Sequence, residues 1–174
     1  SSRLELGICT SDMKDNAWAY GHGNPLFMDG TFNVCKGKVL LFVGLVVGDD
    51  GHGYPVFFMF FSAPSRARSA SASYTASILI RILTSFREFL GTNTAGAMFT
   101  PSFGMTDTDV RERYALLSVF GIESFLCIFH IRQAWELRRR RVLGSGGGSK
   151  AVALRAIATN DLRSLGRTLI NEVL

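Results

Sequence analysis

Two neighbouring apolar segments constrain the fold more than any other feature of this sequence. Val39–Val47 (VLLFVGLVV) has the length and β-branched content of a strand that is buried on both faces. The polar segment Gly48–Gly53 (GDDGHG) has the composition of a turn, and Val56–Phe61 is a second apolar run. This pattern predicts two antiparallel strands joined by a hairpin.

A third strand is predicted just before this hairpin. Pro25–Val34 (PLFMDGTFNV) is an apolar run that contains one carboxylate, Asp29. An acid in the middle of a strand costs desolvation free energy unless something compensates it, and a bound divalent cation would do so. Asp29 is therefore the first candidate for chemistry. The alternative is that the strand ends at Met28 and Asp29-Gly30 forms a turn, because Asp-Gly is a common turn dipeptide.

Beyond the hairpin, helices and strands alternate. The spacing predicts a helix that ends at Gly91, a short strand that leads into Asp107, and three further elements. Three strands followed by alternating helices and strands imply an α/β fold with a mixed five-stranded sheet flanked by helices. Sites in such sheets form at the carboxyl ends of strands, where Asp29 and Asp107 are expected. The five predicted elements are a helix at Ile78–Leu90, a strand at Ser102–Thr106, a helix at Val110–Phe120, a strand at Ser124–His130 and a helix at Ile131–Val142.

The composition indicates a globular protein in a reducing compartment. Hydrophobic residues make up 47% of the chain and charged residues 19%. The apolar runs are too short and too interrupted to form a bilayer-spanning helix, so no membrane partner is expected. The three cysteines, Cys9, Cys35 and Cys127, are odd in number and widely spaced. That pattern argues against a disulfide framework and is typical of an intracellular protein.

The C-terminal part differs from the rest. Gly144–Ser149 (GSGGGS) has the composition of a flexible linker, which indicates an engineered segment, with a natural Gly/Ser loop as the alternative. We expect residues 1–143 to form the core domain and residues 150–174 to form a helical segment that packs on it. Apolar residues at helical spacing support that last helix: Leu162, Leu165, Leu169 and Val173.

Two aspartates at strand ends are what a two-metal phosphoryl-transfer site requires. Carboxylates such as those of Asp29 and Asp107 can share Mg²⁺ or Mn²⁺ ions that lie about 3.5–4 Å apart and clamp the attacking and leaving oxygens of a phosphodiester.

Four successive blocks of the sequence, in order, resemble the Mutator-like element (MULE) transposases of eukaryotes. Those proteins are cut-and-paste DNA transposases whose catalytic domain has the ribonuclease H-like fold. The resemblance runs from about residue 25 to about residue 142. The blocks are MDGTF at Met28–Phe32, the strand-turn-strand segment at Leu40–Ser65, MTDTDVRERYAL at Met105–Leu116 and LCIFHIRQAW at Leu126–Trp135.

The resemblance implies an Asp, Asp, Glu catalytic triad. Asp29 in the DGTF block corresponds to the first catalytic aspartate and Asp107 in the MTD block to the second, with Asp109 as a close competitor. In the family the glutamate lies on a helix after a largely helical insertion. Here the third acid is open between Glu172 on the final helix, Glu136, and an acid outside this chain. In that last case the chain would bind metal weakly and be inactive.

The resemblance also implies a role for Cys127 and His130, which match the family's C-x-x-H signature at the end of the fifth strand. One Cys and one His do not make a zinc site, which needs four ligands, so a structural role is favoured over orienting DNA or the acidic site. Glu112 in the ERYAL block is expected to be a surface ion-pair partner.

The partner that the resemblance implies is double-stranded DNA, in the nucleus, with Mg²⁺ or Mn²⁺ as cofactor and with a homodimer as a further expectation. A cluster of arginines suits a polyanion, although a solvated helix face is the commoner explanation. Two alternatives remain: a domesticated, inactive DNA-binding or regulatory protein of the same fold, and a nuclease that acts on RNA or hybrid duplexes. The expected phosphate contacts are Arg132, Arg138, Arg139, Arg140 and Arg141.

Overall fold

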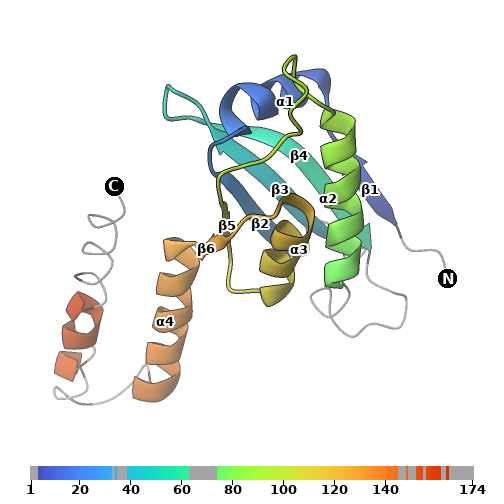
Figure 1. Ribbon diagram of the computed structural model, residues 1–174. Helices are drawn as coiled ribbons and strands as arrows, with labels where there is room; N and C mark the ends of the chain where they lie inside the picture. Colours follow the sequence, from blue (N-terminus) through green and yellow to red (C-terminus); the bar gives the residue numbers. More distant parts are fainter. Residues whose placement is uncertain are drawn as a thin grey trace. The chain divides into compact units, whose positions relative to one another are not determined.

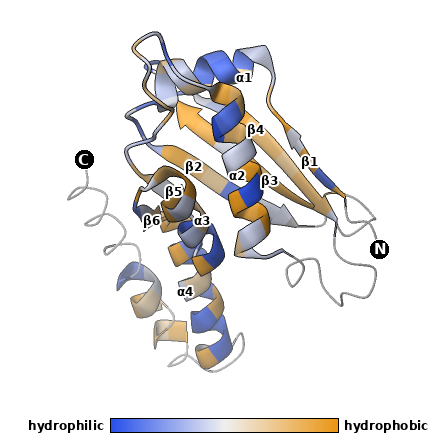
Figure 2. Cartoon of the chain, turned by 45° about the vertical axis from the view of Figure 1, so that its right-hand side comes forward, coloured by the Kyte–Doolittle hydropathy of each residue, from blue (hydrophilic) through white to orange (hydrophobic). Residues whose placement is uncertain are grey.

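The chain forms two compact units, Ser1–Phe125 and Leu126–Leu174, and each is described by itself. The computed structural model describes residues 4–32, 34, 39–62, 74–144, 148, 152–154, 156–161 and 164. The apolar segments of the sequence form a mixed α/β unit, as the hydropathy colouring of its strands shows (Figure 2).

The sheet contains six strands in the order β1-β4-β3-β2-β5-β6 (Figure 1). The mixed α/β class is confirmed, but the prediction of five strands is wrong, because a further strand, β1, pairs antiparallel with β4 at one edge. Four residues in a segment without a clear period give no strand signal of their own. The bounds are β1 Glu5–Ile8, β2 Leu26–Phe32, β3 Val39–Val47, β4 Gly53–Ser62, β5 Gly104–Thr106 and β6 Ser124–Leu126.

The predicted hairpin is confirmed, and β3 pairs antiparallel with both of its neighbours. Alternate residues of β3 are buried, which gives the strand one fully covered face. β2 runs parallel to β5, with Leu26 opposite Gly104 and Phe27 opposite Met105. An antiparallel meander therefore continues into a parallel pair, in which β2 contains Asp29 and β5 ends directly before Asp107.

Two helices pack side by side on the covered face: α2, Ala76–Leu90, and α3, Val110–Phe120 (Figure 1). α2 ends at Gly91 and α3 at Gly121, and both glycines have positive φ angles, as C-terminal caps commonly do. The core beneath the helices is rich in aromatic rings, among them Phe57, whose ring centroid lies 4.8 Å from that of Phe86. Before β2, the short helix α1, Ser11–Asn16, continues into a π-helical turn, η1, Ala17–Gly21.

Two glycines allow this close packing. A Cβ atom at Gly44 in β3 would lie 2.3 Å from the ring of Phe57 on β4. At Gly104 in β5, a Cβ atom would lie 2.6 Å from the side chain of Leu116 on α3. Both distances are far below van der Waals contact, so any larger residue would displace the helix or the neighbouring ring. Gly104 thus sets how closely α3 approaches the strand that leads to Asp107.

The second unit contains α4, Ile128–Leu143. The predicted strand at Ser124–His130 is too long, because only Ser124–Leu126 pairs with the sheet and the helix begins at Ile128. The run SFLCIFH contains no Gly or Pro, so no residue in it marks the end of the strand. Most of the Gly/Ser segment and of the predicted final helix lies outside the described residues. In the part of the chain that is described, no helix is long and apolar enough to cross a membrane.

Candidate functional site

Asp29 lies within a strand. β2 continues past it to Phe32, and Asp29 pairs with Val43 in the antiparallel ladder. The alternative in which the strand stops at Met28 and Asp29-Gly30 forms a turn is therefore wrong. Met28 is buried in the core and Asp29 is exposed, because successive residues of a strand point to opposite faces.

Asp107 occupies the matching position beside the neighbouring strand. Phe27 is opposite Met105 in the parallel ladder, and the two aspartates each follow two residues later. Asp29 is still within β2, whereas Asp107 is the first residue after β5, so the two acids follow the last paired residues of two neighbouring parallel strands. Asp107 is half-buried, and its Oδ1 accepts a hydrogen bond of 2.6 Å from the backbone N–H of Asp109.

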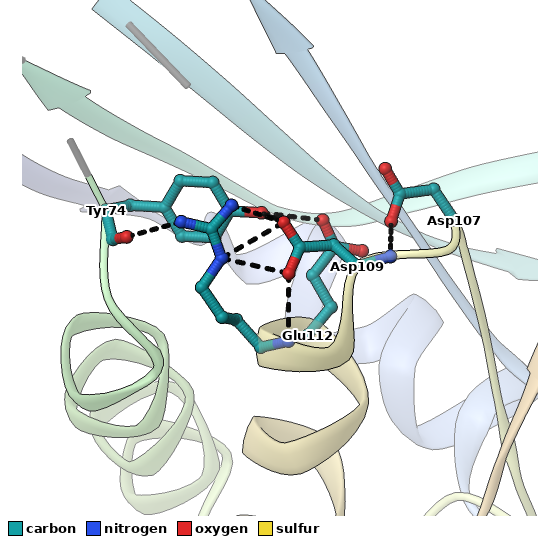
Figure 3. Close-up of polar contacts among 5 residues, drawn as sticks. Tyr74, Asp107, Asp109 and Glu112 are labelled. Carbon is teal, nitrogen blue, oxygen red and sulfur yellow. Dashed lines mark hydrogen bonds and ion pairs between the residues drawn. The ribbon is translucent and has the colours of Figure 1, made fainter. Parts of the chain in front are cut away.

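Asp109, the competitor for the second catalytic position, is occupied by structural contacts (Figure 3). It is the N-cap of α3, and its Oδ1 accepts from the backbone N–H of Arg111 at 2.9 Å. The guanidinium of Arg111 donates to both of its oxygens, and the Tyr74 hydroxyl donates to Oδ2 at 2.5 Å. The hydrogen bonds from Arg111 are the main reason why the pKa of Asp109 is lowered to about 2. These contacts favour Asp107 over Asp109 as a candidate ligand.

Tyr74 and Arg111 complete a clamp around that cap. Arg111 donates to the backbone carbonyl of Tyr74 at 2.9 Å, and its guanidinium carbon lies 3.9 Å from the centroid of the Tyr74 ring. Burial, and next the hydrogen bond to Asp109, raise the pKa of the Tyr74 hydroxyl, so it remains a donor. These contacts therefore connect the start of α3 to Tyr74, which lies just before α2.

Glu112 is the residue that sequence reasoning placed wrongly. It was expected on the surface in an ion pair, yet it is 1% exposed and makes no ion pair with the described residues. Its Oε1 lies 3.4 Å from the Tyr74 hydroxyl, and its Oε2 is buried without a hydrogen-bond partner among the residues that the structure describes. The signal that could have indicated burial is the helical spacing of Glu112 with Ala115, Leu116 and Val119, which are buried on the same helix.

The electrostatics link Glu112 to both candidate ligands. Burial is the main cause that raises the pKa of Glu112 to about 8, and the negative charges of Asp107, Asp109 and Asp29 raise it further. Asp29 comes from β2 and Asp107 from the loop after β5, and the charges of both act on the same buried carboxyl group. The site therefore concentrates negative charge around Glu112.

The donor set fits a hard cation. Mg²⁺ usually keeps several waters and is held by one or two protein carboxylates together with substrate phosphates. Asp29 and Asp107 supply two such carboxylates, and the charges of both act on the buried Glu112. Among the described residues there is no group of three or more His, Cys, Asp or Glu placed to hold one metal ion. A cation here would depend on two ligands from the protein.

The remaining candidate residues belong to the second unit. Glu136 on α4 accepts hydrogen bonds from Arg139 and from Arg140, whose Nε lies 3.0 Å away, and these bonds lower its pKa to about 2. Glu172 lies outside the described residues. Arg132, Arg138 and Arg141 are exposed on the same helix.

The C-x-x-H pair is found at the start of α4. Cys127 is its N-cap and His130 lies in its first turn, so the expectation that the pair ends a strand is wrong. Cys127 is a half-buried free thiol. The structural role expected for the pair stays a prediction.

Comparison with known proteins adds no family assignment. No protein-family model and no curated protein matches this chain.

Proposed function

We propose that this chain is the catalytic core of a DNA transposase of the MULE type, which cleaves and joins phosphodiester bonds with the help of divalent cations. The observation that carries the proposal is that Asp29 in β2 and Asp107 directly after β5 each follow a residue of the Phe27–Met105 pair by two positions, and that the charges of both raise the pKa of Glu112. Two neighbouring carboxylates of this kind can share divalent cations.

The fold is compatible with the proposal. Apart from the edge strand β1, the order is β4-β3-β2-β5-β6, with β2 antiparallel to β3 and parallel to β5. This is compatible with the ribonuclease H-like topology that the resemblance implies. A fold alone does not set a function, so the argument depends on the acids and not on the topology.

Each group of residues has a distinct task in the proposed reaction. Asp29 and Asp107 would hold Mg²⁺ or Mn²⁺, which when bound supplies Lewis-acid stabilisation of the phosphodiester oxygens. Asp109, Tyr74 and Arg111 fix the loop that presents Asp107. The exposed arginines of α4 would bind DNA phosphates, which gives affinity and salt dependence but no sequence reading.

A second candidate function is a catalytically inactive DNA-binding or regulatory protein of the same fold. It is favoured by the lack, among the described residues, of three carboxylates placed around one ion. Such a protein would bind DNA through its basic helix and would not cleave it.

Nicking of supercoiled DNA in the presence of Mg²⁺ or Mn²⁺ tests the proposal. We expect nicking by the wild type that chelation abolishes, and no nicking by Asp29→Asn or Asp107→Asn. Asp12→Asn, an exposed acid on α1, is the matched control and should cleave normally. Undiminished nicking by Asp29→Asn would refute the assignment. DNA binding without nicking by the wild type would favour the inactive protein.

A further inference from the structure

Glu112 is a buried acid that has no role in the cation site proposed at Asp29 and Asp107. The side chain is 1% exposed, and its Oε2 has no hydrogen-bond partner among the described residues. A buried polar atom without a partner destabilises the folded state, and more strongly if it is charged. An apolar residue of similar volume would avoid this cost, so the carboxyl group calls for an explanation beyond packing.

One oxygen of the Glu112 carboxyl group is positioned by the Tyr74 hydroxyl. Its Oε1 faces the Tyr74 hydroxyl at 3.4 Å, and that hydroxyl is itself held by Asp109 at 2.5 Å. In Figure 3 Tyr74 lies on one side of the Glu112 carboxyl group and Asp107 on the other. The unpartnered oxygen is thus held within the acidic site and not in a purely apolar part of the core.

The charges around Glu112 are mostly negative. Asp29 comes from β2, Asp107 and Asp109 from the loop after β5, and the cation Arg111 from α3. Arg111 donates hydrogen bonds to Asp109 and to the backbone carbonyl of Tyr74. A divalent cation bound at Asp29 and Asp107 would reduce the negative charge that acts on Glu112.

We propose that Glu112 is a third carboxylate of the site, a positioning residue that strengthens cation binding at Asp29 and Asp107 by its negative charge without being a direct ligand. This inference rests on the proposed function, because it needs a cation at those two aspartates. Mutation of residues that interact with metal ligands without binding the metal commonly changes metal affinity by about 10–100-fold.

The proposal predicts that cation binding changes the protonation state of Glu112. Without a cation, burial and three neighbouring carboxylates favour the protonated form of Glu112, and its pKa is raised to about 8. A cation at Asp29 and Asp107 offsets their charges and favours the ionised form. At pH 7, binding of the ion should therefore release a proton from Glu112.

Calorimetric Mg²⁺ titration of the whole chain at pH 7, in two buffers of different ionisation enthalpy, measures affinity and proton release together. For the wild type we expect close to one proton released per ion. For E112Q we expect about 10-fold or more weaker binding and release close to zero. E88Q, an exposed acid on α2, is the matched control and should behave as the wild type. E112L keeps the apolar volume without the acid and serves as a second variant if E112Q does not fold.

The outcomes separate the two proposals. If the Asp29→Asn, Asp107→Asn double variant binds Mg²⁺ as the wild type does, the cation site itself is wrong. If the double variant loses binding while E112Q and E112L keep both wild-type affinity and wild-type proton release, only the role of Glu112 is overturned. Weaker binding by E112Q with unchanged proton release would also contradict the proposal, because a purely structural effect would give that result.

Discussion

Two glutamates, one at the start of α3 and one in the middle of α4, have arginine neighbours but opposite properties. Glu136 on α4 is paired with Arg139 and Arg140, and its pKa is lowered to about 2. Glu112 on α3 is buried, and its pKa is raised to about 8. The difference comes from geometry: residues three and four apart share a helix face, whereas adjacent residues do not.

The comparison shows that an arginine adjacent to an acid in the sequence does not necessarily form an ion pair with that acid. Arg111 is next to Glu112 in sequence, but it turns to Asp109 and caps the helix there. Glu112 points into the core among other carboxylates. Burial and the charges nearby in space therefore set the charge state of each acid.

The largest effect is expected on replacing Glu112. The substitution should remove most of the pH dependence of the free energy of unfolding. In the unfolded chain its pKa is near 4.5, and in the folded, cation-free protein it is about 8. The unfolded state therefore releases its proton first as the pH rises, and the folded state becomes less stable between pH 4.5 and pH 8. At about 1.4 kcal/mol per pKa unit, this amounts to a few kcal/mol.

Urea unfolding at a series of pH values measures this effect. E112Q should lose most of the decline over that range and should be more stable than the wild type at pH 8 without divalent cations. Parallel stability curves for the two proteins from pH 4.5 to pH 8 would show that Glu112 is ionised in the folded state, and the contrast with Glu136 would fail.

A smaller effect is expected at Asp109, with the opposite dependence on pH. Its pKa is lowered from 3.8 to about 2, so the stability it contributes is present above pH 3.8 and is lost as the pH falls towards 2. Asp109→Asn keeps a capping side chain but removes the ion pair with Arg111. We expect a loss of about 2 kcal/mol at pH 7. The variant should also unfold with less dependence on pH between 4 and 2, and an unchanged acid transition would contradict this role.

The smallest effect is expected for Glu136→Gln. The acid is half-buried, but its partner Arg140 is exposed, and ion pairs open to solvent contribute little to stability. Thermal melting should not separate this variant from the wild type. A clear loss of stability on replacing Glu136, insensitive to added salt, would mean that α4 depends on this acid and would weaken the contrast drawn above.

The strongest sequence signals predicted the sheet and two of its helices well. β3 has the bounds expected from its apolar run, and α2 and α3 end at the glycines expected to cap them. Local pattern and tertiary packing agree in these elements. β1 was missed because its four residues are defined by pairing with β4, a contact between distant parts of the chain.

The site could be predicted only in part. Asp29 and Asp107 stand out in the sequence as acids next to apolar runs, and each follows by two positions a residue of the Phe27–Met105 pair of the parallel ladder. The roles of Asp109 and Glu112 could not be deduced, because they depend on Tyr74, which reaches them from before α2. A cluster made by residues from three elements leaves no periodic signal in the sequence.

The central claim is that Asp29 and Asp107 together hold a divalent cation. Crystals of the protein grown with Mn²⁺ would test this most directly, because the anomalous signal of the metal locates it independently of the protein. We predict a peak within coordinating distance of carboxylate oxygens of both aspartates, and no peak there in the Asp29→Asn variant. A well-occupied Mn²⁺ elsewhere in the wild type, with no density between the two aspartates, would contradict the account.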